Sequence, residues 1–295
     1  MRSNSQASQP ASRLRTDEPT EKILRSMICP IVVEGAAGPK VIGSSFVVAL
    51  NQRDALLVTA AHNFDWARPP DRSHPSTPQF FRPPQPTEWT REDPVPYIFA
   101  FCDNNLAVAR VLDVRLHERF DLAVFHARIF EEGPTFQYQI GYDSSLATVG
   151  DEVTCLGFRD MKAVALPHAT VYDFPLVARE GRILQIEQDS SRTGATVAHV
   201  DLAIDSGMSG GPLVRFRNGR PYVCAVAMSD MSLDGGAMAK GGGHGKATTV
   251  TALLDIAAPR GWGPATSDGS LNTMRTLRDS GLLRDAGVGE PVSKQ

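Results

Sequence analysis

The chain has 295 residues, enough for one large domain or two of ordinary size, and its composition, 42% hydrophobic and 21% charged, is typical of a globular protein. Thirty basic residues against 33 acidic ones leave a formal net charge of −3. Domains that bind nucleic acid usually carry a strong basic excess, so we expect no nucleic-acid partner. No apolar run approaches the roughly 20 residues that cross a bilayer, so we also expect no membrane-spanning segment and no membrane partner.

The N-terminal stretch, residues 1–22, is polar and has no repeating apolar face, which predicts a disordered tail. It contains neither the apolar core nor the A-x-A-like cleavage site of a secretory signal. We therefore expect a cytoplasmic protein.

The four cysteines are widely scattered, and their spacing, like that of the seven histidines, shows no metal-ligand pattern, so we expect no metal site. Each cysteine lies in an apolar, strand-like run. In a cytoplasmic protein this favours reduced, buried thiols over disulfides. The four are Cys29, Cys102, Cys155 and Cys224.

Short apolar runs rich in Val and Ile alternate with Gly, Pro, Asn or Asp from residue 23 to about residue 258. Eleven such runs at fairly regular spacing predict an all-β sandwich or barrel. Helical periodicity is weak until residues 251–259 and 271–283, each of which could form one short helix.

Two segments interrupt the strand pattern. Residues 66–96 contain nine of the 21 prolines, which predicts a long insertion without regular structure. Residues 232–246 contain six glycines and one histidine, which predicts a mobile loop.

Three fragments carry residues typical of catalytic chemistry. His62 follows an apolar strand, Asp121 opens another, and Ser209 lies in the glycine-rich run 205–213. Singly, each has an ordinary structural interpretation: a histidine after a strand, a capping acid and a tight turn. Together, in the chain order His, Asp, Ser, they are the components of an acyl-transfer site, because a serine hydroxyl needs an adjacent base and the base needs an orienting carboxylate.

The motifs around these residues are TAAH at 59–62, DLAV at 121–124 and GMSGGPL at 207–213. With them the chain resembles the chymotrypsin-fold, trypsin-like serine peptidases over residues 26–260. It is more similar to the bacterial intracellular and HtrA-like branches than to the digestive enzymes. The resemblance implies a mostly β fold of two packed six-stranded antiparallel β-barrels with short C-terminal helices, a triad in the cleft between them, and no cofactor.

On this resemblance the chain divides into four parts. The tail of residues 1–22 is followed by a first barrel over 23–135, which contains the insertion 66–96. The second barrel covers 136–260, and a C-terminal extension covers 261–295.

The resemblance also implies a role for each site residue. Ser209 attacks the scissile carbonyl, His62 takes and returns the proton, and Asp121 orients His62. The backbone N–H groups of Gly207 and Ser209 form the oxyanion hole.

The predicted substrate pocket departs from that of enzymes with basic specificity. Those enzymes carry an Asp six residues before the nucleophile, where this chain has Ala203. Without a buried acid, an Arg or Lys side chain of the substrate would lose its hydration without gaining a partner. We expect a preference for small or medium apolar residues on the acyl side of the cut bond. The other predicted pocket residues are Ala227, Met228 and Ser229, on a strand whose edge could pair with an extended substrate.

Met208 stands where zymogen-activated relatives carry an Asp that pairs with a newly cut N-terminal amine. A thioether cannot form that ion pair. We expect no activation by N-terminal trimming. Activity that is present from synthesis and activity that is gated by loop ordering both stay open.

The leading hypothesis is a serine endopeptidase that acts on protein or peptide substrates, with a regulatory protein partner left open. One alternative is a catalytically idle trypsin-fold module that binds an extended peptide segment. Idle relatives usually lack His, Asp or Ser, and all three are present here. Another is hydrolysis of non-peptide esters, which the same triad would permit as a side activity.

Overall fold

The structure, a computed structural model, describes most of the chain between residues 12 and 286. The described residues are 12–13, 18–35, 38–67, 96–102, 105–117, 119–145, 147–159, 162–166, 169–173, 175–188, 196–217, 220–230, 244–265 and 270–286.

Six antiparallel strands form a first closed barrel in the order β2-β3-β4-β7-β6-β5. Their side chains alternate between the two faces of the sheet, as the period of two in a strand requires. Along β6, for example, Ala107, Ala109 and Val111 are buried, whereas Leu106 and Val108 are exposed. The six strands are β2 (Ile28–Gly35), β3 (Gly38–Asn51), β4 (Asp54–Thr59), β5 (Tyr97–Cys102), β6 (Asn105–Leu116) and β7 (Ala123–Ile129).

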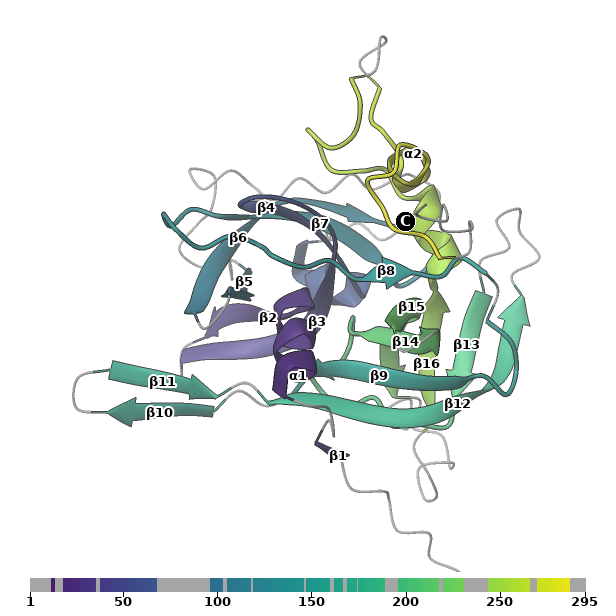
Figure 1. The fold of residues 1–295 in the computed structure, drawn as a ribbon. Helices are drawn as coiled ribbons and strands as arrows, with labels where there is room; N and C mark the ends of the chain where they lie inside the picture. Colours follow the sequence, from purple (N-terminus) through teal and green to yellow (C-terminus); the bar gives the residue numbers. More distant parts are fainter. Residues whose placement is uncertain are drawn as a thin grey trace, which may run out of the picture.

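Six further antiparallel strands form a second ring, because β9 pairs with both β12 and β14 and so closes the order β9-β12-β13-β16-β15-β14. Figure 1 shows the two barrels beside each other. The predicted fold of two six-stranded antiparallel barrels is therefore confirmed. The strands are β9 (Glu152–Phe158), β12 (Leu176–Gln188), β13 (Thr196–Val200), β14 (Pro212–Arg217), β15 (Arg220–Asp230) and β16 (Gly245–Thr249).

Short elements complete the fold. A hairpin of two strands extends away from the barrels in Figure 1. Two small strands add to the second sheet, and three short helices follow β4 or lie near the C-terminus. They are β10 (Lys162–Leu166) and β11 (Ala169–Asp173); β1 (Ser12–Arg13) and β8 (Gly141–Tyr142); and η1 (Ala61–Ala67), η3 (Val250–Asp255) and α2 (Met274–Asp279).

An N-terminal helix, α1 (Glu18–Met27), begins inside the stretch that we expected to be a disordered tail. The residues of that stretch that the structure describes, 12–13 and 18–22, lie in β1 and α1, so the expectation does not hold for them. The helix forms because its last two turns bury Leu24 and Met27 against the barrels, which stabilises a segment too short to be helical alone.

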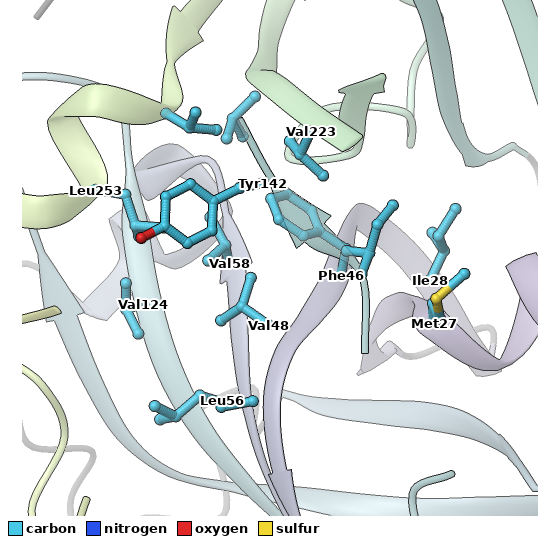
Figure 2. Close-up of a cluster of buried hydrophobic side chains, with 14 of the residues drawn as sticks. Met27, Ile28, Phe46, Val48, Leu56, Val58, Val124, Tyr142, Val223 and Leu253 are labelled. Atoms are coloured by element: carbon cyan, nitrogen blue, oxygen red, sulfur yellow. The ribbon is translucent and has the colours of Figure 1, made fainter. Parts of the chain in front are cut away.

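The core has three parts. One cluster fills each barrel, and a third lies between the barrels. Figure 2 shows that this third cluster joins Phe46 and Val58 of the first barrel to Tyr142, Val223 and Leu253. Burial of this apolar surface holds the two barrels together.

The C-terminal extension packs against this interface. Met274 and Leu277 of α2 and the following Leu283 are buried in the cluster between the barrels. Asp285 forms a parallel bridge with Tyr142.

Several smaller expectations can be compared with the structure. The four cysteines are free and buried, and burial raises the pKa of the Cys155 thiol to about 12. Among the described residues no helix is long and apolar enough to cross a membrane. The proline-rich insertion and the glycine-rich loop lie, except for residues 66–67, 96 and 244–246, outside the described residues. The domain boundaries and the cytoplasmic location stay predictions.

Candidate active site

His62 and Asp121 lie next to the ends of two neighbouring strands of the first barrel. His62 lies in η1, directly after β4, and Asp121 lies just before β7. β4 pairs with β7 so that Thr59 faces Ala123. The end of one strand and the start of the next therefore bring the two side chains together.

The imidazole of His62 contacts both other residues of the predicted triad. Its Nδ1 lies 2.6 Å from Oδ2 of Asp121, and its Nε2 lies 2.6 Å from Oγ of Ser209. The other carboxylate oxygen of Asp121 accepts a hydrogen bond of 2.8 Å from the backbone N–H of His62. Two contacts with one carboxylate hold the ring in a single orientation. We assign the proton to Nδ1, which leaves the lone pair of Nε2 facing the serine hydroxyl.

Ser209 lies in a tight turn that two glycines permit. Gly207 and Gly210 have φ angles of +89° and +84°. A Cβ atom on Gly207 would lie 2.7 Å from the carbonyl oxygen of Phe158, and one on Gly210 would lie 2.0 Å from Oγ1 of Thr59. Both positions therefore require glycine, for conformation and for space.

Backbone hydrogen bonds set the orientation of the peptide groups in this turn. The N–H of Met208 donates to the carbonyl of Asp205 over 2.9 Å, which closes a four-residue turn. The carbonyl of Met208 accepts from Gly211 over 2.9 Å. In a trans peptide the N–H points opposite to the carbonyl, so the N–H of Ser209 points away from Gly211.

An ion pair anchors the start of the turn. Nη2 and Nε of Arg179 lie 2.7 and 3.1 Å from Oδ2 of Asp205, and Arg159 approaches the same oxygen at 3.3 Å. The carboxylate nearest to the nucleophile turn on its N-terminal side is thus already neutralised by two guanidinium groups. The sequence offered no signal for this arrangement.

Of the predicted pocket residues, one precedes the nucleophile turn and the other three lie on β15. Ala203 lies partly exposed before the nucleophile turn. Ala227 is fully buried in the core of the second barrel and contacts the turn through its backbone, accepting from the N–H of Gly210 over 2.7 Å. The carbonyl oxygen of Met228 lies against Oγ of Ser209 and competes with Nε2 of His62 for its single hydroxyl proton. Ser229 continues β15 and pairs with Lys246.

Sequence reasoning missed Ser44, a fully buried serine of β3. Its N–H donates to the carbonyl of Ser209 over 2.7 Å, and its hydroxyl donates to the carbonyl of Gly207 over 2.7 Å. The N–H of Phe158 donates to the same hydroxyl over 2.8 Å. The available signal was a pair of serines, at 44 and 45, inside an otherwise apolar strand.

Asn63, the residue after His62, was also missed as a site residue. Its Nδ2 donates to the carbonyl of Ser209 over 3.0 Å and to Oγ1 of Thr59 over 2.9 Å. A Cβ atom on Gly43 would lie 2.2 Å from that Nδ2, so the amide fills the space that a side chain at position 43 would need. Ser44 and Asn63 together join the nucleophile turn to the first barrel.

Within the part of the chain that the structure describes, no group of three or more His, Cys, Asp or Glu residues could hold a metal ion. The described groups that meet at the site are a hydroxyl, an imidazole, a carboxylate and peptide groups.

Comparison with known proteins gives a family match for more than half of the chain. The family model of the trypsin-like peptidase domain matches residues 43–226. A search of curated proteins found no match.

The solved structures that are similar to the chain include two protease structures. The first is the apo form of the MamO protease domain from Magnetospirillum magneticum, with a TM-score of 0.45 and 12% identity over 79% of this chain and 96% of that one. The second is the inactive form of the Rv3671c protease, with a TM-score of 0.43 and 16% identity over 82% of this chain and 92% of that one.

Proposed function

Because the chain belongs to the trypsin-like peptidase family, we propose that it is a serine endopeptidase that cleaves protein or peptide substrates through an acyl-enzyme. One observation carries the proposal: His62 lies 2.6 Å from the hydroxyl of Ser209 through one ring nitrogen and 2.6 Å from Asp121 through the other. These two contacts support the roles of His62 as the base for Ser209 and of Asp121 as the group that orients the base.

In the first half of the reaction, Oγ of Ser209 bonds to the carbonyl carbon of the scissile peptide while its proton passes to Nε2 of His62. The resulting imidazolium is stabilised by Asp121. The C–N bond then breaks as His62 gives the proton to the leaving amine. The acyl group remains on Ser209.

In the second half, a water molecule replaces the leaving amine. His62 takes a proton from the water as its oxygen attacks the acyl carbon. The bond to Ser209 breaks, and the serine oxygen regains its proton from His62. No group outside the triad and the backbone is needed for these steps.

The N–H groups of Gly207 and Ser209 are the oxyanion donors in this proposal. The negative charge on the tetrahedral intermediate develops beside the nucleophile turn. Because the Gly207–Met208 and Met208–Ser209 peptides are held by hydrogen bonds before substrate binds, they need little reorganisation. Loss of one such donor lowers kcat by about 100- to 1000-fold in comparable sites.

We also propose that the enzyme prefers small or medium apolar residues on the acyl side of the cut bond. Ala203 brings no charge to the pocket, and the carboxylate of Asp205 is already paired with Arg179. The buried side chain of Ile204 lies against Gly245, whose added Cβ atom would be 2.7 Å from Cδ1 of Ile204. Of the described residues 203–208, none offers an unpaired acid to a substrate ammonium or guanidinium.

A fluorophosphonate probe tests the proposed catalysis, because it reacts with an activated serine hydroxyl. We expect labelling of the wild type and of the control Ser280→Ala, a serine at the end of α2, and no labelling of Ser209→Ala. Labelling of all three, or of none, would contradict the proposal. A peptide library with Ala, Val, Leu or Arg before the cut bond then tests the specificity, and preferred cleavage after Arg would overturn it.

A further inference from the structure

Ser44 belongs to the first barrel but reaches into the second. It lies in β3 and is fully buried, and its hydroxyl is inserted between Phe158 at the end of β9 and Gly207 in the nucleophile turn. Its own N–H bonds to the carbonyl of Ser209 over 2.7 Å. One residue therefore makes three hydrogen bonds across the barrel interface.

The direction of the two hydroxyl bonds is determined by chemistry. The backbone N–H of Phe158 can only donate, so Oγ of Ser44 accepts from it at 2.8 Å. The carbonyl of Gly207 can only accept, so the single hydroxyl proton goes to it over 2.7 Å. The hydroxyl thus connects a donor that is part of a barrel strand to a carbonyl in the turn.

Gly207 needs such a connection because a glycine does not restrict its own backbone. With φ at +89° and no Cβ atom, the peptide groups on either side of it can rotate at low cost. The Gly207–Met208 peptide is held at its N–H by the carbonyl of Asp205 and at its carbonyl by Ser44. Rotation of this peptide would break both bonds inside a buried site.

We propose that Ser44 is a positioning residue, whose hydroxyl holds the Gly207–Met208 peptide. This peptide lies between the two peptide groups that carry the N–H of Gly207 and the N–H of Ser209, so the bond fixes the orientation of the two oxyanion donors relative to each other. The inference rests on the proposed function. It assigns the ordering of the oxyanion hole to a hydrogen bond between the barrels. Met208, the residue next in the turn, is fully buried in the apolar core of the second barrel and offers no charge for this purpose.

Removal of the hydroxyl leaves a buried N–H on Phe158 and a buried carbonyl on Gly207. Unsatisfied buried groups are unfavourable, and a structure relieves them by the cheapest available movement. The Phe158 N–H is held in a strand, whereas the Gly207 carbonyl can turn toward water because glycine permits the rotation. In Ser44→Ala the turn therefore loses its preset orientation.

Ser45→Ala is the matched control. Ser45 is also fully buried in β3, and its hydroxyl donates over 2.9 Å to the carbonyl of Cys29 inside the first barrel, away from the turn. Both variants lose one buried hydroxyl, and we expect each to lower Tm by about 2–4 °C. Only Ser44→Ala should change catalysis.

The first test measures kcat and KM for a peptide substrate, together with the affinity for a peptide aldehyde and for the matching peptide amide. The aldehyde carbon bonds to Oγ of Ser209 while the hydroxyl proton passes to His62, so the adduct places an oxyanion in the hole; the amide forms no adduct. For Ser44→Ala we expect about 10- to 100-fold losses in kcat and in aldehyde affinity, with KM and amide affinity within about twofold. For Ser45→Ala we expect all four quantities within about twofold.

An equal effect of the two variants, or an effect of Ser44→Ala on KM alone, would overturn the proposal. If Ser44→Ala does not fold, Ser44→Cys takes its place, because a thiol keeps much of the volume and is a weaker donor; the same losses are then expected in the same direction.

Crystal structures, which do not depend on catalytic activity, test this inference separately from the proposed function. If the wild type neither reacts with the fluorophosphonate nor cleaves peptides, the proposed function fails. Crystal structures of the wild type and Ser44→Ala still decide the positioning role. We expect the Gly207 carbonyl to point at Ser44 in the first and to turn away in the second. An unchanged turn in the variant would refute the role of Ser44.

Discussion

The two sides of the active site are built in different ways. On the first-barrel side, His62 follows β4 and Asp121 precedes β7, two strands that pair with each other, and the carboxylate of Asp121 contacts both the ring and the backbone N–H of His62. On the other side, Ser209 lies in a glycine turn whose carbonyl groups bond to residues of the opposite barrel. The base is therefore oriented within one barrel, whereas the nucleophile depends on how the two barrels dock. Substitutions on the first-barrel side should therefore lower kcat alone, whereas substitutions in the nucleophile turn should lower both kcat and stability.

The largest expected effect lies on the first-barrel side. Asp121→Asn keeps the shape of the side chain but removes the charge and presents an N–H group to the imidazole, which favours the wrong tautomer of His62. We expect kcat to fall by about 10⁴-fold. The free energy of unfolding should change by less than about 1 kcal/mol, because the site is partly exposed.

Steady-state kinetics and urea unfolding check this prediction. Asp255→Asn, which loses an exposed pair with Arg275, is the control and should retain full activity. A loss of less than tenfold in Asp121→Asn would mean that His62 is oriented by something other than this carboxylate.

The next largest effect is expected in the nucleophile turn. Gly207→Ala places a Cβ atom 2.7 Å from the carbonyl oxygen of Phe158, at a φ of +89° that an alanine rarely adopts. Because the turn must shift, we expect kcat to fall by about 100- to 1000-fold and stability to fall by about 1–3 kcal/mol. Asp121→Asn should lower kcat alone, whereas Gly207→Ala should lower both kcat and the free energy of unfolding.

Gly261→Ala separates the effect of the positive φ angle from the effect of the steric clash. Gly261 has a similar φ of +85°, but an added Cβ atom there would meet nothing within 4 Å. We expect a loss of about 1 kcal/mol in this control with unchanged kcat. If Gly207→Ala behaves like Gly261→Ala, the turn does not supply the oxyanion donors.

A smaller effect should follow from the contact between the barrels. Asn63→Ala removes the bonds from Nδ2 to the carbonyl of Ser209 and to Thr59, and we expect a loss of about 2 kcal/mol in stability with about a tenfold lower kcat. Gly43→Ala should also be destabilising, because its Cβ atom would lie 2.2 Å from the same Nδ2.

The two substitutions should be coupled. Without the amide at position 63, the methyl group at position 43 has space, so the double variant should be more stable than the sum of the single changes predicts. A double-mutant cycle by urea unfolding measures this coupling, which we expect at about 1 kcal/mol or more. Additive changes would show that the amide does not occupy the space beside Gly43.

The sequence predicts features that depend on neighbouring residues, and it does not show contacts between residues that are far apart in the chain. The strand alternation predicted an all-β sandwich or barrel, because the period of two is a local property. The three motifs carried the family resemblance, and that resemblance implied the double barrel with His62, Asp121 and Ser209 brought together. The role of Ser44 was not visible, because a serine in an apolar strand acquires partners only when residues 114 and 163 positions away fold against it. The pairing of Asp205 with Arg179, 26 residues away, was hidden for the same reason.

The helix α1 was missed for a related cause. Only its second half carries the apolar residues that pack on the barrels, and its first residues resemble the polar tail that precedes them. Periodicity over fewer than two turns is a weak signal.

The smallest expected effect lies in the first barrel at Asp54, which belongs to a cluster with His126 and Arg128 on β7. Burial raises the pKa of Asp54, but hydrogen bonds from Arg128 and His126 outweigh it and hold the pKa below its ordinary value of 3.8. A carboxyl group whose pKa is lower in the folded state stabilises the protein above its unfolded pKa, and this contribution is lost as the pH falls through the folded value. We therefore expect Asp54→Asn to lose about 1 kcal/mol at pH 7, with a difference from wild type that shrinks as the pH falls below about 3.8. Urea unfolding across this range measures the difference, and kcat at pH 7 should stay unchanged. A difference that persists undiminished at the lowest pH would assign the effect to packing, and a loss of kcat would show that this barrel transmits changes to the site.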